Sequence, residues 1–395
     1  MAGPDLEPRL QAIVAQETPR FSDAEYARRQ AALDGLMQQH GVDHLLVVSS
    51  NRAGNATQWL TGWPGTVEAF TVFRPGERMT MYVEWHNHVP LARHIAHTVD
   101  VQWGAHQGMA KTIDELKRRG ARTVGVIGPL PAVKLRPLEA AFTVKSLDAG
   151  YTRLRMIKSD EELDWLRIGA ALSDAGLAAL MAGAQPGLDE RELVALVESG
   201  YLRHGGTTMI HYLGCTPMAA PTLHVPRQYP SPRKLAVGDV LFCELSAFWW
   251  DYAGQVLRTM TVGAPPTPLY RDLYQTAEDA FDAVTGVLRH GTGMQEIIDA
   301  AGLIEARGFT VCDDLLHGFG GGYFQPILGS RSRPAGALPD MVLEENMTVV
   351  VQPNVTTTEA DEDRRAGVQV GEMVRVTRSG FERLHRAERR LARIA

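Results

Sequence analysis

Long apolar runs, paired cysteines and a surplus of basic residues are all missing from this 395-residue sequence. No stretch reaches the roughly 18 consecutive apolar residues of a membrane-spanning helix, and the first residues lack the basic start and apolar core of a signal peptide. Three scattered cysteines without C-x-x-C spacing give neither a disulfide framework nor a zinc knuckle. Net charge is −6, which disfavours nucleic acid and anionic membranes as partners. We therefore expect a cytoplasmic protein with reduced cysteines that acts on small molecules or peptides.

The length and the order of predicted elements indicate two domains. A single core rarely grows past roughly 250–300 residues, and a hydrophobic fraction of 45% is enough for packed cores. Residues 1–20 are polar and read as an arm over the surface or over a partner subunit. Strands and helices then alternate, which predicts an α/β domain over residues 1–153. The predicted strands are 43–50, 79–85 and 123–128, and the predicted helices are 22–40, 110–120 and 135–142.

The second domain, residues 154–395, is predicted to be α+β, with a mostly antiparallel sheet backed by helices. Ser159 with Glu162, and Asp189 with Glu192, have the spacing of capping boxes and mark the starts of two helices. Further predicted helices are 268–288 and 293–308, and the predicted strands are 207–214, 239–250, 254–263, 347–355 and 371–377. The charged run at 385–394 is expected to be a solvated helix face.

Six motifs in this order resemble those of the creatinase/aminopeptidase P/methionine aminopeptidase superfamily, over about residues 20–385. They are the R-x-x-K-S-x-E-E-L-x-x-L-R pattern that ends at Arg167, the L-H-V-P-x-x-x-P-S-P-R-K-L-x-x-G-D-V pattern from Leu223, R-T at 258–259, H-G-F-G from His317, E-N-M from Glu345 and V-x-V-T from Val374. The resemblance implies a pita-bread fold for the second domain and a homodimer.

Peptidases of this family hold two divalent metals with two aspartates, one histidine and two glutamates. Matched motif to motif, these positions fall on Glu244, Gln255, His317, Gln352 and Gly371. Two dications need carboxylates to neutralise their charge, and here two of the four acidic positions are amides and one is glycine. We therefore predict no binuclear metal centre and no cofactor. A single adventitious ion on Glu244 and His317 stays open as an alternative.

The superfamily also contains creatinase, which hydrolyses a C–N bond without metal and uses a histidine as general acid and base. The matching residue is His224, whose imidazole can take a proton from water and give it to a leaving nitrogen near neutral pH. The resemblance implies catalytic roles for His224, Glu244 and His317. Ectoine hydrolase is another such relative. A carboxylate expected just before Arg-Thr is replaced by Leu257, which disfavours creatine itself.

The remaining predicted site residues would bind the substrate: Gln255, Gln352, His211, Arg258 and Glu372. Glu372 follows the vacated Gly371, although neighbouring side chains of a strand face opposite ways. A buried ion pair between Glu244 and Arg258 is the alternative interpretation of those two residues. Peptidase chemistry is further disfavoured because Phe324 and Gln325 stand where related enzymes carry a His-Glu pair.

The sequence thus predicts a metal-independent hydrolase of a C–N bond in a small nitrogen-rich compound. Two alternatives remain. One is a non-catalytic pita-bread module that binds a peptide or protein, and the other is a dipeptidase-like or lyase-like enzyme with one residual metal.

Overall fold

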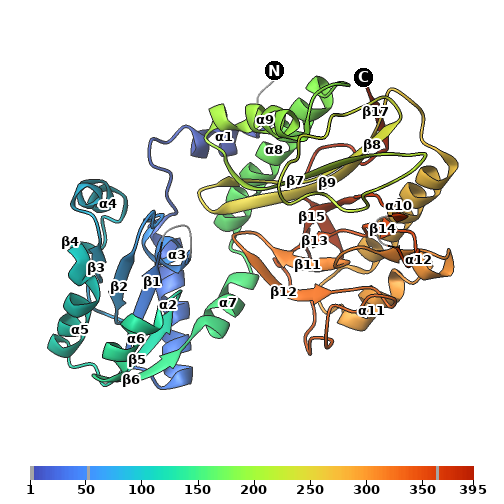
Figure 1. The fold of residues 1–395 in the computed structure, drawn as a ribbon. Coiled ribbons are helices and arrows are strands. Elements are labelled where there is room, and N and C mark those ends of the chain that lie inside the picture. The colour runs from blue at the N-terminus through green and yellow to red at the C-terminus, as the bar shows by residue number, and fades with distance from the viewer. Residues whose placement is uncertain (1–3, 51–53, 362–363) are drawn as a thin grey trace. The chain divides into compact units, whose positions relative to one another are not determined.

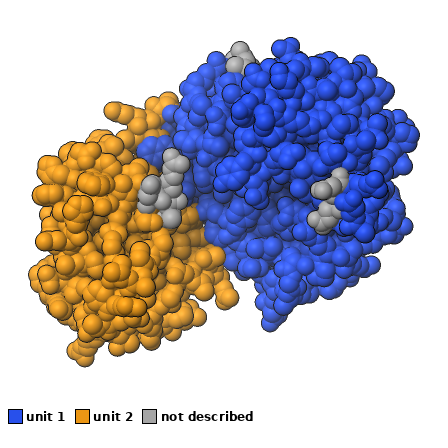
Figure 2. Space-filling model, in the orientation of Figure 1, with its two compact units in different colours: residues 1–14, 156–395 blue, residues 15–155 orange. Residues whose placement is uncertain are grey.

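The computed structural model describes residues 4–50, 54–361 and 364–395, which divide into two compact units (Figures 1 and 2). One unit spans residues 15–155, and the other joins residues 4–14 to residues 156–395. The N-terminal arm, predicted to belong to the first domain, is therefore part of the second unit. Ion pairs hold it there, at 3.0 Å between Arg9 and Asp164 and at 2.5 Å between Arg386 and Asp5.

The unit of residues 15–155 is built around a six-stranded sheet in the order β4-β3-β2-β1-β5-β6. Its strands are β1 His44–Ser49, β2 Ala69–Phe73, β3 Thr80–Val83, β4 Asp100–Trp103, β5 Thr123–Ile127 and β6 Thr143–Ser146. Its helices are α2 Asp23–His40, α3 Ala56–Thr61, α4 Val89–Ile95, α5 Gly108–Arg118, α6 Ala132–Glu139 and α7 Asp148–Met156, which continues one residue into the second unit. Three short strands, β2, β4 and β6, were not predicted from the sequence.

Local signals explain where the best-predicted helices begin and end. The Ser22 side chain accepts a hydrogen bond from the Glu25 backbone at 3.1 Å at the start of α2, and Gly41 takes the left-handed conformation after its end. Both predicted capping boxes are present, at Ser159 before α8 Asp160–Gly183 and at Asp189 before α9 Glu190–Tyr201.

The second unit contains a nine-stranded, mostly antiparallel sheet whose main path is β12-β11-β13-β15-β9-β8-β7. The strands of this path are β7 Thr207–Pro217, β8 Asp239–Trp249, β9 Tyr252–Val262, β11 Leu316–Phe319, β12 Tyr323–Leu328, β13 Thr348–Val351 and β15 Gly371–Val376. Off this path, β16 Phe381–Arg383 pairs with β15 and β17 Ala392–Ile394 pairs with β9, and β10 Thr310–Val311 pairs with β14 Val355–Thr356 in a separate ribbon. Besides α8 and α9, this unit contains α1 Pro8–Val14, α10 Pro268–Val287, α11 Met294–Ala300 and α12 Leu303–Ala306.

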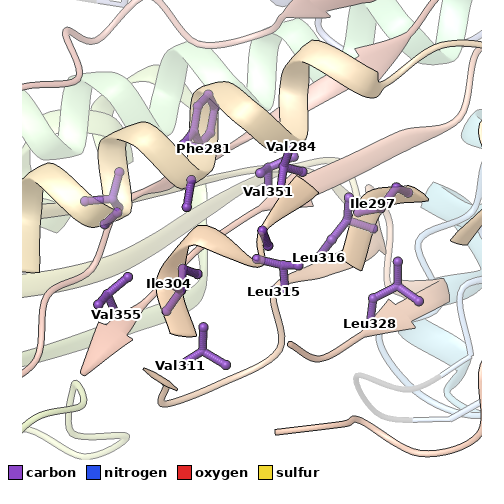
Figure 3. Packing of buried hydrophobic residues seen from close by; sticks show 14 of the residues in the cluster. Phe281, Val284, Ile297, Ile304, Val311, Leu315, Leu316, Leu328, Val351 and Val355 are labelled. Carbon is purple, nitrogen blue, oxygen red and sulfur yellow. The ribbon is translucent and has the colours of Figure 1, made fainter. Parts of the chain in front are cut away.

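Helices pack on this sheet through close backbone contact and a large apolar core. A side chain at Gly254 of β9 would lie 2.3 Å from the Ala170 Cα of α8, so glycine is required there. By length and composition α8 could cross a membrane, but it packs against β8 and β9. Figure 3 shows this core, in which Phe281 and Val284 of α10 belong to the same cluster as Leu315 and Leu316.

The charged C-terminal run is not a helix, which corrects the sequence-based prediction. Asp174 of α8 accepts hydrogen bonds from the His385 ring at 2.8 Å and from the Arg386 backbone at 2.7 Å, and these bonds hold the segment extended. The chain then forms β17 parallel to β9. Tertiary pairing therefore outweighs the helical propensity of the Arg, Ala and Glu residues.

Candidate functional site

Strand register divides the predicted site residues between the two faces of the large sheet. Paired residues on neighbouring strands point to the same face, and successive residues of one strand alternate. Glu244 of β8 lies opposite Tyr212 of β7 and Leu257 of β9, and Leu257 lies opposite Gly371 of β15. We call this side of the sheet the site face.

Gln255 and His317 lie on the same face. Gln255 is two residues before Leu257, and its side-chain Nε2 donates a hydrogen bond to the Glu244 carboxyl group across the β8–β9 pair. His317 of β11 lies opposite Val350 of β13, which in turn lies opposite Met373, two residues after Gly371. The register therefore brings Gln255, Glu244, His317 and the vacated position 371 to one side.

His211, Arg258 and Glu372 occupy the opposite face, which corrects the prediction that they bind substrate beside Glu244. His211 lies opposite Leu245, and Glu372 lies opposite Val256. His211 is hydrogen-bonded to the Tyr201 hydroxyl of α9. Alternation along the strand places these side chains away from Glu244.

Arg258 pairs with Glu372 and not with Glu244, so the ion pair considered from the sequence is also wrong. Its Nη2 lies 2.8 Å from Glu372, and its Nη1 donates to the Gly371 carbonyl at 2.7 Å. Arg383 also binds the Glu372 carboxylate. Burial alone would raise the pKa of Glu372, but hydrogen bonds from Arg383 and the charge of Arg258 hold it below its usual value.

Glu244 is a buried carboxyl group without a cationic partner among the ion pairs of the described residues. Burial raises the pKa of Glu244 to about 8, and the nearby charges of Asp313 and Asp314 act in the same direction. The hydrogen bond from Gln255 opposes this shift. The carboxyl group therefore favours its protonated form at neutral pH.

His317 is 2% exposed and electrically neutral at pH 7. Burial lowers the pKa of His317 to about 4, against the opposing effects of the Gly318 carbonyl, Asp313 and Gln352. Its Nδ1 lies 3.2 Å from the Gly318 carbonyl oxygen, which can only accept, so Nδ1 carries the hydrogen. A side chain at Gly318 would lie 2.6 Å from the Gln325 carbonyl oxygen, so glycine at this position lets β11 pair closely with β12.

Gln352 occupies the space next to the vacated position 371. A Cβ built on Gly371 would lie 2.6 Å from the Val351 carbonyl oxygen and 2.9 Å from both Cα and Cβ of Gln352. Gln352 is 1% exposed, and its Nε2 donates to the Asp314 carbonyl at 3.2 Å. Its own carbonyl oxygen has no hydrogen-bond partner among the described residues. The uncharged Gln352 amide therefore stands at one position where a carboxylate is expected. Its Cα and Cβ also lie where a side chain at position 371 would need space.

His224 lies half-buried on the loop between β7 and β8. The preceding Leu223 packs against Gly214, which is two residues from Tyr212 and so shares the site face. The His224 carbonyl would lie 2.3 Å from a side chain at Gly367, in the segment before β15. The loop that carries His224 therefore crosses the site face.

Sequence reasoning missed two tyrosines and an aspartate at this site. The ring of Tyr323 lies against His317, with centroids 4.7 Å apart, while Phe324 is buried in the core. Burial and the charge of Glu244 raise the pKa of Tyr212. Burial and Asp313 raise the pKa of Asp314. The tyrosines lie outside the motifs that guided the prediction, so only strand pairing could identify them.

The donor set does not fit a binuclear metal centre. No three His, Cys, Asp or Glu side chains are grouped for metal binding in residues 4–50, 54–361 and 364–395. At the five positions matched to the metal ligands, one carboxyl group, one imidazole, two amides and a glycine supply too little negative charge for two dications.

Comparisons with known proteins agree with this architecture. Residues 164–378 match the model of metallopeptidase family M24. An Xaa-Pro dipeptidase of Pyrococcus furiosus is 23% identical over 287 residues, covering 71% of this chain and 79% of the relative. The uncharacterized peptidase YqhT of Bacillus subtilis is 23% identical over 359 residues, covering 88% and 95%. The solved structure of an Xaa-Pro dipeptidase from Bacillus anthracis superposes with a TM-score of 0.79 at 19% identity, covering 93% of this chain and all of that one. These likenesses support the pita-bread fold.

Proposed function

Because the chain belongs to metallopeptidase family M24 but has one carboxyl group at the positions where four are expected, we propose that it hydrolyses a C–N bond of a small nitrogen-rich compound without a metal ion. The observation that carries this proposal is the donor set on the site face. The buried Glu244 carboxyl group accepts a hydrogen bond from Gln255, and amides and a glycine stand at the other three positions where carboxylates are expected. These side chains can orient a polar substrate by hydrogen bonds, and they supply little negative charge for a dication.

His224 is the proposed general acid and base. It takes a proton from water while the water oxygen forms a bond to the substrate carbon. The C–N bond then breaks, its electron pair stays on nitrogen, and His224 returns the proton to that nitrogen. Glu244 and His317 orient the water and the reacting group, and Gln255 and Gln352 fix the substrate. His317 cannot replace His224 as the proton carrier near pH 7, because its pKa is about 4.

The names of the relatives favour a second candidate function. Xaa-Pro dipeptidase is the name of relatives in Pyrococcus furiosus and Pyrococcus horikoshii. An enzyme of that kind would here hold one ion between Glu244 and His317. Two protein ligands are fewer than the three or four of stable sites, so this candidate ranks second.

One experiment separates the candidates. The protein is purified without chelator, its metal content is measured, and turnover of guanidino, ureido, cyclic amidine and Xaa-Pro compounds is assayed with and without EDTA. His224→Ala is compared with His94→Ala, which changes an exposed histidine of α4. We expect EDTA-insensitive turnover of a nitrogen-rich compound that His224→Ala abolishes and His94→Ala preserves.

Two other results would contradict the proposal. EDTA-sensitive cleavage of an Xaa-Pro dipeptide, with stoichiometric metal, would support the second candidate. Turnover that His224→Ala leaves unchanged would refute the assigned proton carrier.

A further inference from the structure

Tyr323 lies at the edge of the site and is accessible from solvent. It begins β12, the edge strand of the main sheet path, and is 48% exposed. Its ring centroid is 4.7 Å from that of the buried His317, with an angle of 39° between the planes, and 5.2 Å from that of Phe319. A molecule that reaches His317 from the edge of the sheet would therefore meet this ring.

The Tyr323 hydroxyl is a hydrogen-bond donor at the edge of the site. A tyrosine phenol keeps its hydrogen at neutral pH because its ordinary pKa is about 10. The side-chain nitrogen of Gln255 donates to Glu244. The phenol can therefore donate its hydrogen to an acceptor on a ligand that reaches this edge.

The other polar ends at the site accept hydrogen bonds. The amide nitrogens of Gln255 and Gln352 donate to Glu244 and to the Asp314 carbonyl, so the remaining end of each side chain is a carbonyl oxygen. Both of these oxygens are buried without a hydrogen-bond partner among the described residues. A buried acceptor without a partner is costly, so a ligand with N–H groups would satisfy both. Tyr323 supplies the complementary donor.

We propose that Tyr323 contacts the substrate and donates its phenolic hydrogen to the acceptor atom on the scissile carbon, which selects a ureido or amide carbonyl over a guanidinium group. This inference rests on the proposed function and specifies its substrate class. A ureido group combines N–H donors for Gln255 and Gln352 with a carbonyl oxygen for Tyr323, whereas a guanidinium has donors only. When water adds to the carbonyl carbon, the oxygen gains negative charge, and a phenol already in place stabilises it.

The test compares Tyr323→Phe with Tyr270→Phe, which removes a hydroxyl from the α10 core that has no hydrogen-bond partner among the described residues. Calorimetry measures the binding of N-carbamoylglycine and guanidinoacetate, which differ in having oxygen or nitrogen on the central carbon. We expect Tyr323→Phe to weaken N-carbamoylglycine binding by about 5- to 10-fold, in keeping with the loss of one hydrogen bond. Guanidinoacetate binding and both affinities of Tyr270→Phe should stay unchanged.

Kinetics on the ureido compound that the chain hydrolyses give the second readout. Removing one donor to a developing oxyanion typically lowers kcat by about 10²- to 10³-fold, and KM should change much less. A thermal unfolding midpoint equal to that of Tyr270→Phe would show that the fold is intact.

Two failures are distinguishable. Equal losses for both probes, or a Tyr323→Phe variant with wild-type kcat, would overturn the role of Tyr323 and leave the proposed function standing. This inference would be overturned if the wild-type chain binds neither probe and hydrolyses no ureido or amide compound. The proposed function would be overturned as well if the chain hydrolyses no nitrogen-rich compound at all.

Discussion

Replacing Glu244 by Gln should make the protein more stable, and increasingly so as the pH rises. The folded state holds the Glu244 proton up to about pH 8, whereas the unfolded state releases it near the ordinary value of 4.5. Between these values the unfolded state binds fewer protons, so the free energy of unfolding falls as the pH increases. A glutamine keeps an acceptor for the Gln255 amide and has no proton to lose.

The magnitude follows from the width of this pH window. At 1.36 kcal/mol per pKa unit, Glu244 lowers the free energy of unfolding by about 3 kcal/mol at pH 7 and by about 5 kcal/mol at pH 9. At pH 5 the loss is under about 1 kcal/mol. Urea unfolding of the wild type and of Glu244→Gln at these three pH values measures the difference. Glu139→Gln, the same change at the exposed end of α6, is the control and should show no such trend. A stability difference independent of pH would refute the reasoning, because it would mean that Glu244 is already ionised.

Three further predictions test the two faces of the sheet. Gly371→Glu should destabilise the fold by about 1–3 kcal/mol in urea unfolding and should not create a metal site, because the new Cβ would lie 2.6 Å from the Val351 carbonyl oxygen; bound metal after dialysis against Mn²⁺ would contradict this. Glu372→Gln should lower the free energy of unfolding by about 3–5 kcal/mol, because it leaves the buried Arg258 without its anion. A loss below about 1 kcal/mol would show that solvent screens the pair. The His317 ring should stay neutral from about pH 5 to 9 in NMR titration, given its pKa of about 4, and a midpoint near 6.5 would show an exposed ring.

The sequence could predict those features that depend on local chemistry. Ser159 and Asp189 mark helix starts because a capping side chain and its partner lie three residues apart. Motifs fixed the positions of Gln255, Glu244 and His317 in the sequence, and the strand register brings them to one face. Alternation along a strand anticipated that Glu372 would face away from position 371.

Contacts that depend on pairing between distant strands could not be predicted from the sequence. Arg258 might have met either acid as judged from the sequence alone, and only the register of β9 with β15 assigns it to Glu372. Tyr323 reaches His317 through the pairing of β11 with β12, whose register shifts at Gly318. The extended C-terminal run likewise depends on Asp174, more than 200 residues earlier in the sequence.

The contrast between the two faces bears on whether the site is decayed. On the face away from Glu244, the same strands keep a buried carboxylate with two arginines, although losing either partner would be costly. On the site face, acidic positions became amides and a glycine, and Gln255 and Gln352 direct their amide nitrogens to defined acceptors. Random loss of metal ligands would leave cavities or unpaired charges of no common chemistry. The free ends of both amides are instead the same kind of group, a buried carbonyl oxygen, which is the arrangement expected of a site that selects a ligand by its N–H groups.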